Sequence, residues 1–412
     1  MMWRHTLPLS NNRKLPPLPQ GLLFIKSPFS FLQLVSYSHA ETWKSFKADK
    51  ISVQIFLEKR VNTSSRGNAL VLSAALSLVL LISCFFFLAV GIEPFAAYKI
   101  IGEEIFLTMY GWQDLLVKMT PLMFTGLAVA LAAKMRQWNI GAEGQFHMGT
   151  FAMTWVALNF DGHLPGVILI VLMFIMAIIG GGLWGSIPGF LKARFGVNEI
   201  ITSLLLNYVA AAWIDHLLFG PWRDPVSNNF PITREFSSSA QLPNFGNTSI
   251  HAGLIIAFII VVIVAWIMRE TQLGFKIRLT GDNPDAARYA GVNIRTLTIL
   301  VFAASGAIAG LAGFSEVAGI HYRLQQNISI GYGYTGIIVA WLARNHPLGV
   351  IFSAFFMSII FVSAEVLQIE YGLPISMVYL YQGIILFTVL GTDIFTEYRL
   401  RITRFWPKEG VN

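Results

Sequence analysis

The sequence predicts an all-α protein, a polytopic bundle of about ten helices that cross a membrane. Three observations support this fold class. Of the 412 residues, 55% are hydrophobic and only 12% are charged, whereas soluble domains carry about 25% charged residues. The mean hydropathy is +0.61. The apolar residues also gather in uncharged runs, most of them close to the ~20 residues that a helix needs to cross a bilayer.

Ten runs are candidate spans. Seven are long: 68–92, 166–191, 200–219, 252–268, 297–315, 348–364 and 374–392. Three are shorter: 119–133, 145–160 and 329–343. Because the shorter runs do not reach a full span, we expect broken or short helices around residues 119–160 and 329–343.

The basic residues set the expected orientation. With ten spans and a cytoplasmic N-terminus, only five of the 29 Lys and Arg residues would lie outside: Lys99, Lys118, Arg223, Arg234 and Arg323. Cytoplasmic loops carry the excess of Lys and Arg, so both termini are predicted to be cytoplasmic. We expect a disordered cytoplasmic extension over residues 1–66, a membrane domain over 67–393, and a basic cytoplasmic tail over 394–412.

Several function classes are excluded by the composition. The net charge of +7 is spread between apolar runs and not clustered on one soluble face, so no nucleic acid is expected as a partner. A single cysteine, Cys84, rules out an intramolecular disulfide and a cysteine-based metal site. The histidines show no metal-ligand spacing and no catalytic arrangement is legible, so we expect neither a metal nor a catalytic residue. No Gly-Lys dipeptide occurs, hence no P-loop.

A polar, glycine-containing break lies between two of the shorter runs. Residues 138–145 read WNIGAEGQ, and irregular backbone at membrane depth is tolerated only where it lines protein or water. Trp138, Asn139, Glu143 and Gln145 are therefore candidates for the path of a polar solute. Glu143 has two interpretations: a path or gating residue bonded to the Asn139 and Gln145 amides, or a residue that fixes the broken backbone.

A polar stripe marks the run that follows. Glu199, Ser203 and Asn207 are spaced i, i+4, i+8 and share one helix face. This face either lines a translocation path or makes hydrogen bonds between helices. Asn198 and Asn207 are the members expected to face the path, and Glu199 is a further candidate.

Two connections are more than linkers. In residues 269–296, Asp282 or Asn283 can cap a helix, Pro284 suits its first turn and Gly291 its end. A two-turn helix there either docks into a soluble partner or lies along the membrane surface. The polar loop 220–251, expected outside, either docks a partner or is a passive surface loop.

Four motifs carry a family resemblance: WNIGAEGQF (138–146), FGVNEIITSLLLNYVA (195–210), GDNPDAARYAGV (281–292) and GYGYTGIIVAWLARNHPLGVIFSA (331–354). They resemble the permease subunits of bacterial ABC importers for nucleosides and simple sugars, and more closely the nucleoside type. The resemblance runs from about residue 58 to about residue 400. It implies a multi-pass protein of the bacterial inner membrane that performs no covalent chemistry.

The resemblance also implies partners. Such permeases pair with a second, related permease, here expected as a heterodimer, and sit on ATPase subunits that bind the ATP, so this chain needs no cofactor. An extracytoplasmic lipoprotein delivers the solute. The segment Gly281–Gly291 resembles the helix that couples to the ATPase, with signature positions at Asn283, Ala286, Ala287 and Gly291, and it includes Arg288. Tyr334 could stack on a nucleobase or sugar ring, or belong to an interfacial aromatic belt.

Two rival functions remain open at this point. An ion-driven secondary transporter would need a titratable residue within the spans, for which Glu143, Glu199 or Asp215 are available. An intramembrane hydrolase or transferase would need a nucleophile and a base inside the bundle.

Overall fold

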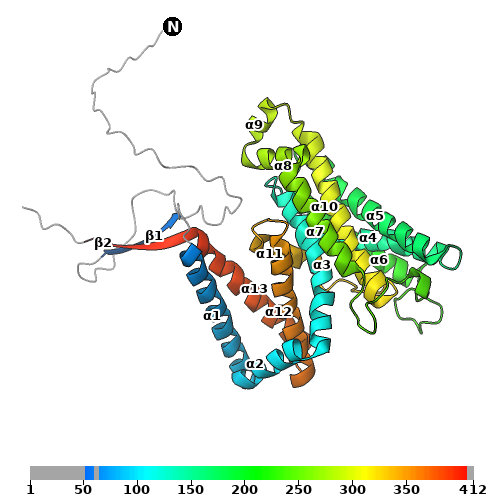
Figure 1. Ribbon diagram of the computed structural model, residues 1–412, viewed down its shortest axis with the longest axis horizontal. Coiled ribbons are helices and arrows are strands. Elements are labelled where there is room, and N and C mark those ends of the chain that lie inside the picture. The colour runs from blue at the N-terminus through cyan, green and yellow to red at the C-terminus, as the bar shows by residue number, and fades with distance from the viewer. Residues whose placement is uncertain (1–51, 60–64, 406–412) are drawn as a thin grey trace, which may run out of the picture. The chain divides into compact units, whose positions relative to one another are not determined.

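The computed structural model describes residues 52–59 and 65–405 (Figure 1). The helices all lie in one compact unit, residues 57–400, and a second unit contains residues 1–56 and 401–412. Within the described residues, the helices are α1 (Ser65–Val90), α2 (Pro94–Gly102), η2 (Glu103–Leu107), α3 (Met109–Ala133), α4 (Ala142–Phe160), α5 (Gly166–Phe195), α6 (Glu199–Phe219), η3 (Ser238–Ala240), α7 (Gly253–Glu270), α8 (Gln272–Asp282), α9 (Pro284–Tyr289), α10 (Ile294–Glu316), η4 (Val317–His321), α11 (Tyr332–Leu342), α12 (Gly349–Tyr371) and α13 (Ile375–Glu397).

Every one of the ten predicted runs coincides with a helix. Of the described helices, six are long and apolar enough to cross a membrane: α3, α5, α6, α7, α10 with η4, and α12. The described part of α1 and the α2–η2 segment form a pair bent by 116°, which makes a seventh if it counts as one span. The chain is thus a predominantly helical, multi-pass protein, while ten spans and cytoplasmic termini stay predictions.

The first arm of the polar break is longer than the sequence suggested. The apolar run begins near Met119, but α3 begins ten residues earlier, after Thr108, whose hydroxyl accepts the Gly111 N–H at 2.9 Å. The polar residues of this first part do not end the helix because their partners lie beside it. Lys118 pairs with Glu365 of α12 at 2.5 Å, and Gln113 accepts the Ser249 N–H at 2.8 Å. The prediction of a short first arm was therefore wrong.

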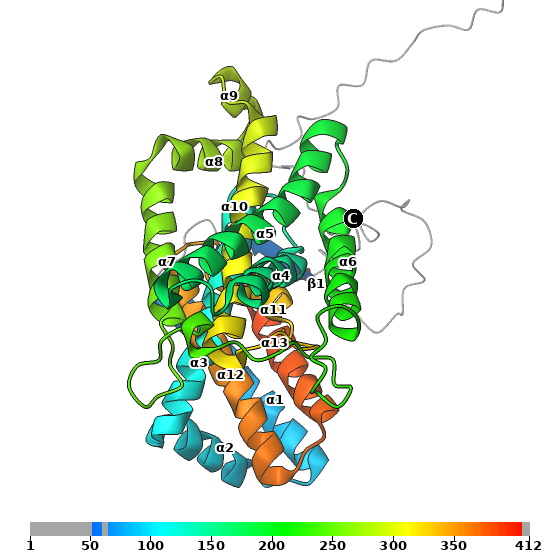
Figure 2. The ribbon, with the colours of Figure 1, turned by 90° about the vertical axis from the view of Figure 1, so that its right-hand side faces the viewer.

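The break itself and the second short helix are present. Residues 134–141 separate α3 from α4, which has 19 residues, and α11 has only 11. In Figure 2 the short α11 lies among α3, α12 and α13. The predictions of a break after α3 and of a short helix near residues 329–343 are thus confirmed. Both could be read from the sequence because polar and glycine residues bound the apolar runs there.

Close backbone contact between α5 and α10 holds the centre of the bundle. A Cβ atom added at Gly181 would collide with the backbone oxygen of Gly306, and one added at Gly306 would collide with that of Gly181. Lipid tails are as apolar as leucine, so helices in a membrane associate through such close packing and not through the hydrophobic effect. This contact fixes α10, which also packs against α3 and α4 beside the break.

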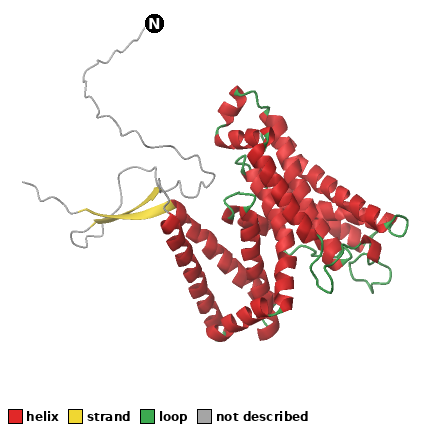
Figure 3. Cartoon of the chain, in the orientation of Figure 1, coloured by secondary structure: helices red, strands yellow, loops and turns green. Residues whose placement is uncertain are grey.

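Two strands depart from the all-helical expectation. β1 (Ser52–Lys59) and β2 (Tyr398–Phe405) form a two-stranded sheet, drawn in yellow in Figure 3. β1 belongs to the segment predicted to be a disordered extension, and the remainder of that segment, apart from Ser65 and Arg66 at the start of α1, lies outside the described residues. β2 belongs to the predicted basic tail, whose last residues, 406–412, are likewise outside them.

The loop between α6 and α7 is a packed element. Its Thr233 N–H donates to the carbonyl of Leu324 at 2.9 Å, and the Leu324 N–H returns a bond to the Thr233 hydroxyl at 3.0 Å. Phe236 N–H donates to the Tyr322 carbonyl at 2.7 Å. The loop is therefore tied to the connection between η4 and α11 by main-chain hydrogen bonds, as a small sheet would be.

Candidate functional site: the polar junction of α4, α6, α10 and α11

Two amide side chains close the turn that leads into α4. Asn139 donates from Nδ2 to the Gln145 Oε1 at 2.8 Å, and Gln145 donates from Nε2 back to Asn139 Oδ1 at 3.0 Å. Asn139 also donates to Ser305 Oγ of α10 at 2.8 Å and accepts the Gly141 N–H at 3.0 Å. Both amides are 1% exposed. Since all these groups are paired, the turn is a rigid unit tied to α10.

Glu143 joins α4 to α11. Its Oε2 accepts the Gly333 N–H, in the first turn of α11, at 2.7 Å. An anionic acceptor at a helix N-terminus satisfies an otherwise unpaired donor and complements the helix dipole. His147, one turn along α4, places Nε2 3.8 Å from the other carboxylate oxygen. The predicted bonds from Glu143 to Asn139 and Gln145 are absent, because those two amides pair with each other.

Gly333 makes this contact possible. A Cβ atom there would lie 2.5 Å from the Glu143 Cα, closer than any real side chain would permit. The backbones of α4 and α11 therefore touch where the carboxylate caps the short helix. The observation supports the interpretation of Glu143 as the residue that fixes the broken segment in this conformation.

Two members of the predicted polar stripe of α6, Ser203 and Asn207, lie against the same junction. Glu199, Ser203 and Asn207 are all buried. Asn207 accepts the Gly144 N–H at 2.8 Å and donates to the Ile140 carbonyl at 2.8 Å, so α6 also holds the turn in place. Glu199 pairs with Lys192 at 2.7 Å across the α5–α6 connection.

The remaining predicted residues divide between the junction and the surface. Tyr334 is 39% exposed, and its hydroxyl accepts from Asn207 at 3.3 Å, so it lies at the edge of the junction. Trp138 stacks on Trp341 with ring centroids 5.7 Å apart. Asn198 is exposed and accepts the Ile200 N–H at 2.9 Å as the cap of α6. Asn198 therefore does not join the junction with the others.

The predicted capped helix is α9. Asn283 is its cap, and its Oδ1 accepts the N–H groups of Asp285 at 3.0 Å and Ala286 at 3.1 Å. Arg288 pairs with Asp285 at 2.8 Å, and Gly291 follows with φ of +76°, a left-handed conformation that glycine adopts readily. The preceding helix α8 was not predicted. Together they form an α8–α9–α10 corner beyond the end of α7 (Figure 2).

Only part of this helix is available to a partner. Ala287 is fully buried inside the corner, whereas Tyr289 is 94% exposed. Of the predicted signature positions, Ala287 therefore packs inside the corner, and the exposed aromatic group of α9 is Tyr289.

The corner is connected to the polar junction through α3. A Cβ atom at Gly281 would collide with the backbone oxygen of Lys134, the residue that follows α3 and begins the break. Burial lowers the pKa of Lys134 and nearby Arg278 lowers it further, while Asp282 acts in the opposite direction. This backbone contact joins α8, which precedes α9, to the start of the break that contains Asn139.

The sequence missed two polar residues of α10. Ser305 links the break to α3 by donating to the Ala128 carbonyl at 2.6 Å. Glu316 was treated as the boundary of a span that ended at Ser315, but α10 includes it and continues into η4. The signal was available, because the apolar residues Val317, Ala318 and Ile320 follow Glu316.

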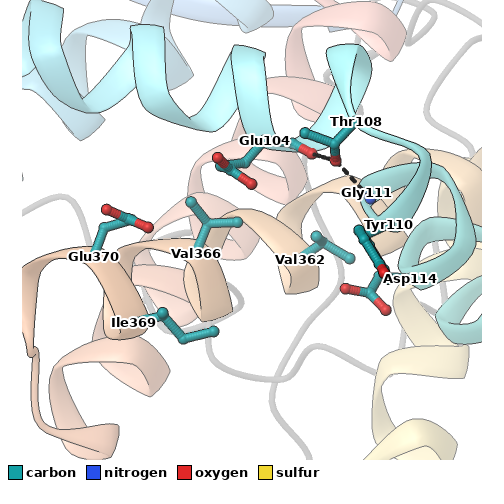
Figure 4. A pocket seen from close by; sticks show the side chains of 9 residues that line it. All are labelled: Glu104, Thr108, Tyr110, Gly111, Asp114, Val362, Val366, Ile369 and Glu370. Atoms are coloured by element: carbon teal, nitrogen blue, oxygen red, sulfur yellow. Dashed lines mark hydrogen bonds between the residues drawn. The ribbon is translucent and has the colours of Figure 1, made fainter.

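A small pocket of about 120 Å³ lies apart from this junction, between η2, the start of α3 and the end of α12 (Figure 4). Glu104, Asp114 and Glu370 surround Val362 and Val366 there. None of the predicted site residues lines it. In the described residues no group of three His, Cys, Asp or Glu side chains is arranged to hold a metal ion.

Comparisons with known proteins place the chain in a family. Residues 112–390 match the family described as branched-chain amino acid transport system / permease component. The glucose ABC transporter permease protein TsgB13 of Haloferax volcanii is 37% identical over 325 residues, 76% of this chain and 85% of the relative. The guanosine ABC transporter permease protein NupP of Bacillus subtilis is 33% identical over 77% of this chain and 90% of its own.

A third relative agrees with these two. The nucleoside ABC transporter permease protein NupB of Lactococcus lactis is 32% identical over 75% of this chain and 87% of its own length. The family match, residues 112–390, includes the break, the α6 stripe, the α8–α9–α10 corner and α11. This chain belongs to the branched-chain amino acid transport system / permease component family and is a permease subunit of an ABC transporter.

Proposed function

We propose that the chain is the membrane permease of an ATP-driven importer that carries nucleosides or related simple sugars inward. The observation that carries this proposal is the match over most of the chain to permeases named for guanosine, nucleosides and glucose. The sequence contains no P-loop, which supports a division between this chain, which would form the solute path, and another subunit, which would hydrolyse ATP. The chain itself performs no covalent step.

The proposed assembly has three further components. An ATPase binds on the cytoplasmic side, a second permease completes a heterodimer, and an extracytoplasmic lipoprotein delivers the solute. The location is the bacterial inner membrane, with both termini cytoplasmic as the distribution of Lys and Arg favours. The packed α6–α7 loop would then face outward, on the side of the lipoprotein, and the α8–α9–α10 corner would face the ATPase.

The solute would pass beside the polar junction. Asn139 and Gln145 bond each other, Asn207 bonds the backbone of the break, and Glu143 bonds the Gly333 N–H in this conformation. ATP hydrolysis would alternate the permease pair between outward-open and inward-open states. Movement of α9 would reach the junction through the contact of Gly281 with Lys134.

An ion-driven secondary transporter is the second candidate. It needs a carboxylate that is free to bind a proton or sodium ion, and two of the three available ones are already engaged. Glu199 is paired with Lys192 and Glu143 caps α11. These contacts make Glu143 and Glu199 poor ion ligands in this conformation, whereas Asp215, and in addition Glu316, stay available to this second candidate. The ATP-driven mechanism is preferred on the relatives named as ABC transporter permeases.

The test uses the assembled importer reconstituted in vesicles. Radiolabelled guanosine is supplied on the side of the lipoprotein, and ATP on the side of the ATPase. We expect uptake with ATP, and none with a proton or sodium gradient alone. The matched control is a substitution of the catalytic carboxylate residue in the ATPase partner, because it removes ATP hydrolysis and leaves the permease unchanged. Uptake driven by an ion gradient without ATP would refute the proposal.

A further inference from the structure

Glu316 is a buried carboxylate with one unused oxygen. It is the last residue of α10 and is 5% exposed. Its Oε1 accepts the Tyr332 hydroxyl at 3.5 Å and lies 3.4 Å from His321 Nε2. Oε2 is buried as well and has no hydrogen-bond partner among the described residues. Both protein donors are thus directed to the same oxygen.

Neighbouring side chains hold the two donors, Tyr332 and His321, in place. The Tyr332 ring packs between Phe146 and Phe361, with centroids 6.3 and 6.2 Å away, and the residue is 2% exposed. The second ring nitrogen of His321 lies 3.3 Å from the Gln325 side-chain amide. When that amide donates to Nδ1, the proton of the ring is on Nε2, directed at Glu316. The group is preorganised, and only Oε2 is left without a donor.

Leaving that oxygen unpaired is costly. A buried acceptor without a donor loses the hydrogen bonds that it would make to water. Carboxylates within membrane segments are rare, face the interior of the bundle, and mark the paths of solutes and ions. In a transporter, a polar group that has no hydrogen-bond partner in one conformation can receive one from the solute in another conformation.

The position of Glu316 agrees with this. It lies where α10 passes into the π-helical turn η4, and its partner Tyr332 is the first residue of the short α11. π-Helical turns and interrupted helices are frequent at the functional sites of membrane proteins. Glu143, which caps the same short helix, places this group next to the polar junction.

We propose that Glu316, Tyr332 and His321 form a subsite that recognises neighbouring hydroxyl groups of the transported solute. The ligand class is a vicinal diol, as in ribose or a pyranose. One hydroxyl would donate to the free Oε2, and the adjacent one would exchange hydrogen bonds with the Tyr332 hydroxyl. The site is closed here and becomes accessible when the ends of α10 and α11 separate during transport. This inference rests on the proposed function.

The experiment compares two solutes in the assembled importer. Vesicle uptake is measured for guanosine and for its 2′,3′-dideoxy analogue, which lacks the diol, in the wild type and in Glu316→Gln. The receptor is the same in both, so its own selectivity cancels in the ratio of the two preferences. Glu365→Gln is the matched control, a nearby carboxylate whose partner is Lys118. We expect the preference for guanosine to fall at least about tenfold in Glu316→Gln and to persist in the control.

Tyr332→Phe is the second variant, because it removes a hydroxyl and leaves the ring. It should lower the preference in the same direction. Unchanged preferences in both variants, with guanosine uptake retained, would overturn the subsite and leave the proposed function intact. Loss of both proteins from the membrane while Glu365→Gln inserts normally would assign the group to folding and would also overturn it. If the wild type carries neither guanosine nor a simple sugar, the proposed function fails, and the subsite with it.

Discussion

At the scale of single residues, the carboxylates of this protein differ mainly in what they contact. Glu143 holds the N-terminus of α11, Glu199 pairs with Lys192, and Glu316 has one oxygen without a partner. All three are buried to a similar degree. Burial of the residue therefore does not distinguish the three carboxylates; Glu316 differs because its second oxygen is itself buried and has no hydrogen-bond partner among the described residues.

Glu143→Gln tests the structural role directly. The amide oxygen can still accept the Gly333 N–H, but a neutral acceptor holds the positive end of α11 less strongly, by about 1 kcal/mol. We expect the variant to reach the membrane at the wild-type level and to transport several-fold more slowly. Uptake normalised to the amount of protein in the membrane provides the measurement.

Glu199→Gln serves as the control for this substitution, since it also neutralises a buried carboxylate but lies away from α11. Disappearance of Glu143→Gln from the membrane would show that the residue is needed to fold. Unchanged uptake would show that capping of α11 does not limit transport.

At the scale of elements, the exposed side of α9 depends on how the helix packs in the α8–α9–α10 corner. Asn283 and Gly291 act as the start and stop that their residue types predict. The side that the helix presents is decided by its packing: Ala287 faces inward and Tyr289 faces solvent. An arginine at Ala287 would disrupt the corner and would not report on docking.

Tyr289→Ala is the informative substitution. A large exposed aromatic side chain at the end of a helix is the type of residue that dominates binding at interfaces. We expect the variant to insert normally, to lower solute uptake at least about tenfold, and to leave ATP hydrolysis uncoupled from transport. Uptake and phosphate release are measured on the same vesicles.

Phe275→Ala is the matched control, because this α8 residue is also an exposed aromatic, at 55%. It should leave coupling intact. If the two variants lower uptake equally, the effect belongs to the exposed surface in general and the docking role of α9 is wrong.

At the scale of the whole molecule, the α6–α7 loop connects distant helices. Asp161, which follows α4, accepts the Ser237 N–H at 2.9 Å, and the Ser249 N–H reaches Gln113 of α3. Burial raises the pKa of Asp161, but the hydrogen bonds from Ser237 and Ser239 outweigh it and hold the pKa below the usual value. Asp161 therefore stays ionised in weak acid.

We expect His251 to make the attachment of this loop dependent on pH. Burial lowers its pKa from 6.5 to about 4, and its Nδ1 accepts the Gly253 N–H at 3.1 Å. The detached loop binds a proton below pH 6.5 whereas the attached loop does not, so attachment is strongest above pH 6.5. It weakens by at most about 1.4 kcal/mol per pH unit as the pH falls towards 4.

We expect hydrogen exchange of residues 232–251 to increase between pH 7 and pH 5, after correction for the intrinsic rate. In His251→Asn the side-chain oxygen can still accept the Gly253 N–H but does not titrate, so the increase should be lost. Equal pH dependence in the wild type and the variant would rule out His251 as the titrating group.

The sequence alone determined the class of the protein, the positions of its apolar helices, the polar break, and the caps of α9. These features depend on local properties: hydrophobic length, helix capping and the conformational freedom of glycine. The tertiary structure decided which polar residues are partners. In the folded chain Lys118 pairs with Glu365, so α3 extends beyond the predicted apolar run. Glu143 bonds α11 and not Asn139, and one oxygen of Glu316 has no partner among the described residues. Hydrogen-bond partners more than 100 residues apart depend on how the helices pack, and no local pattern contains that information.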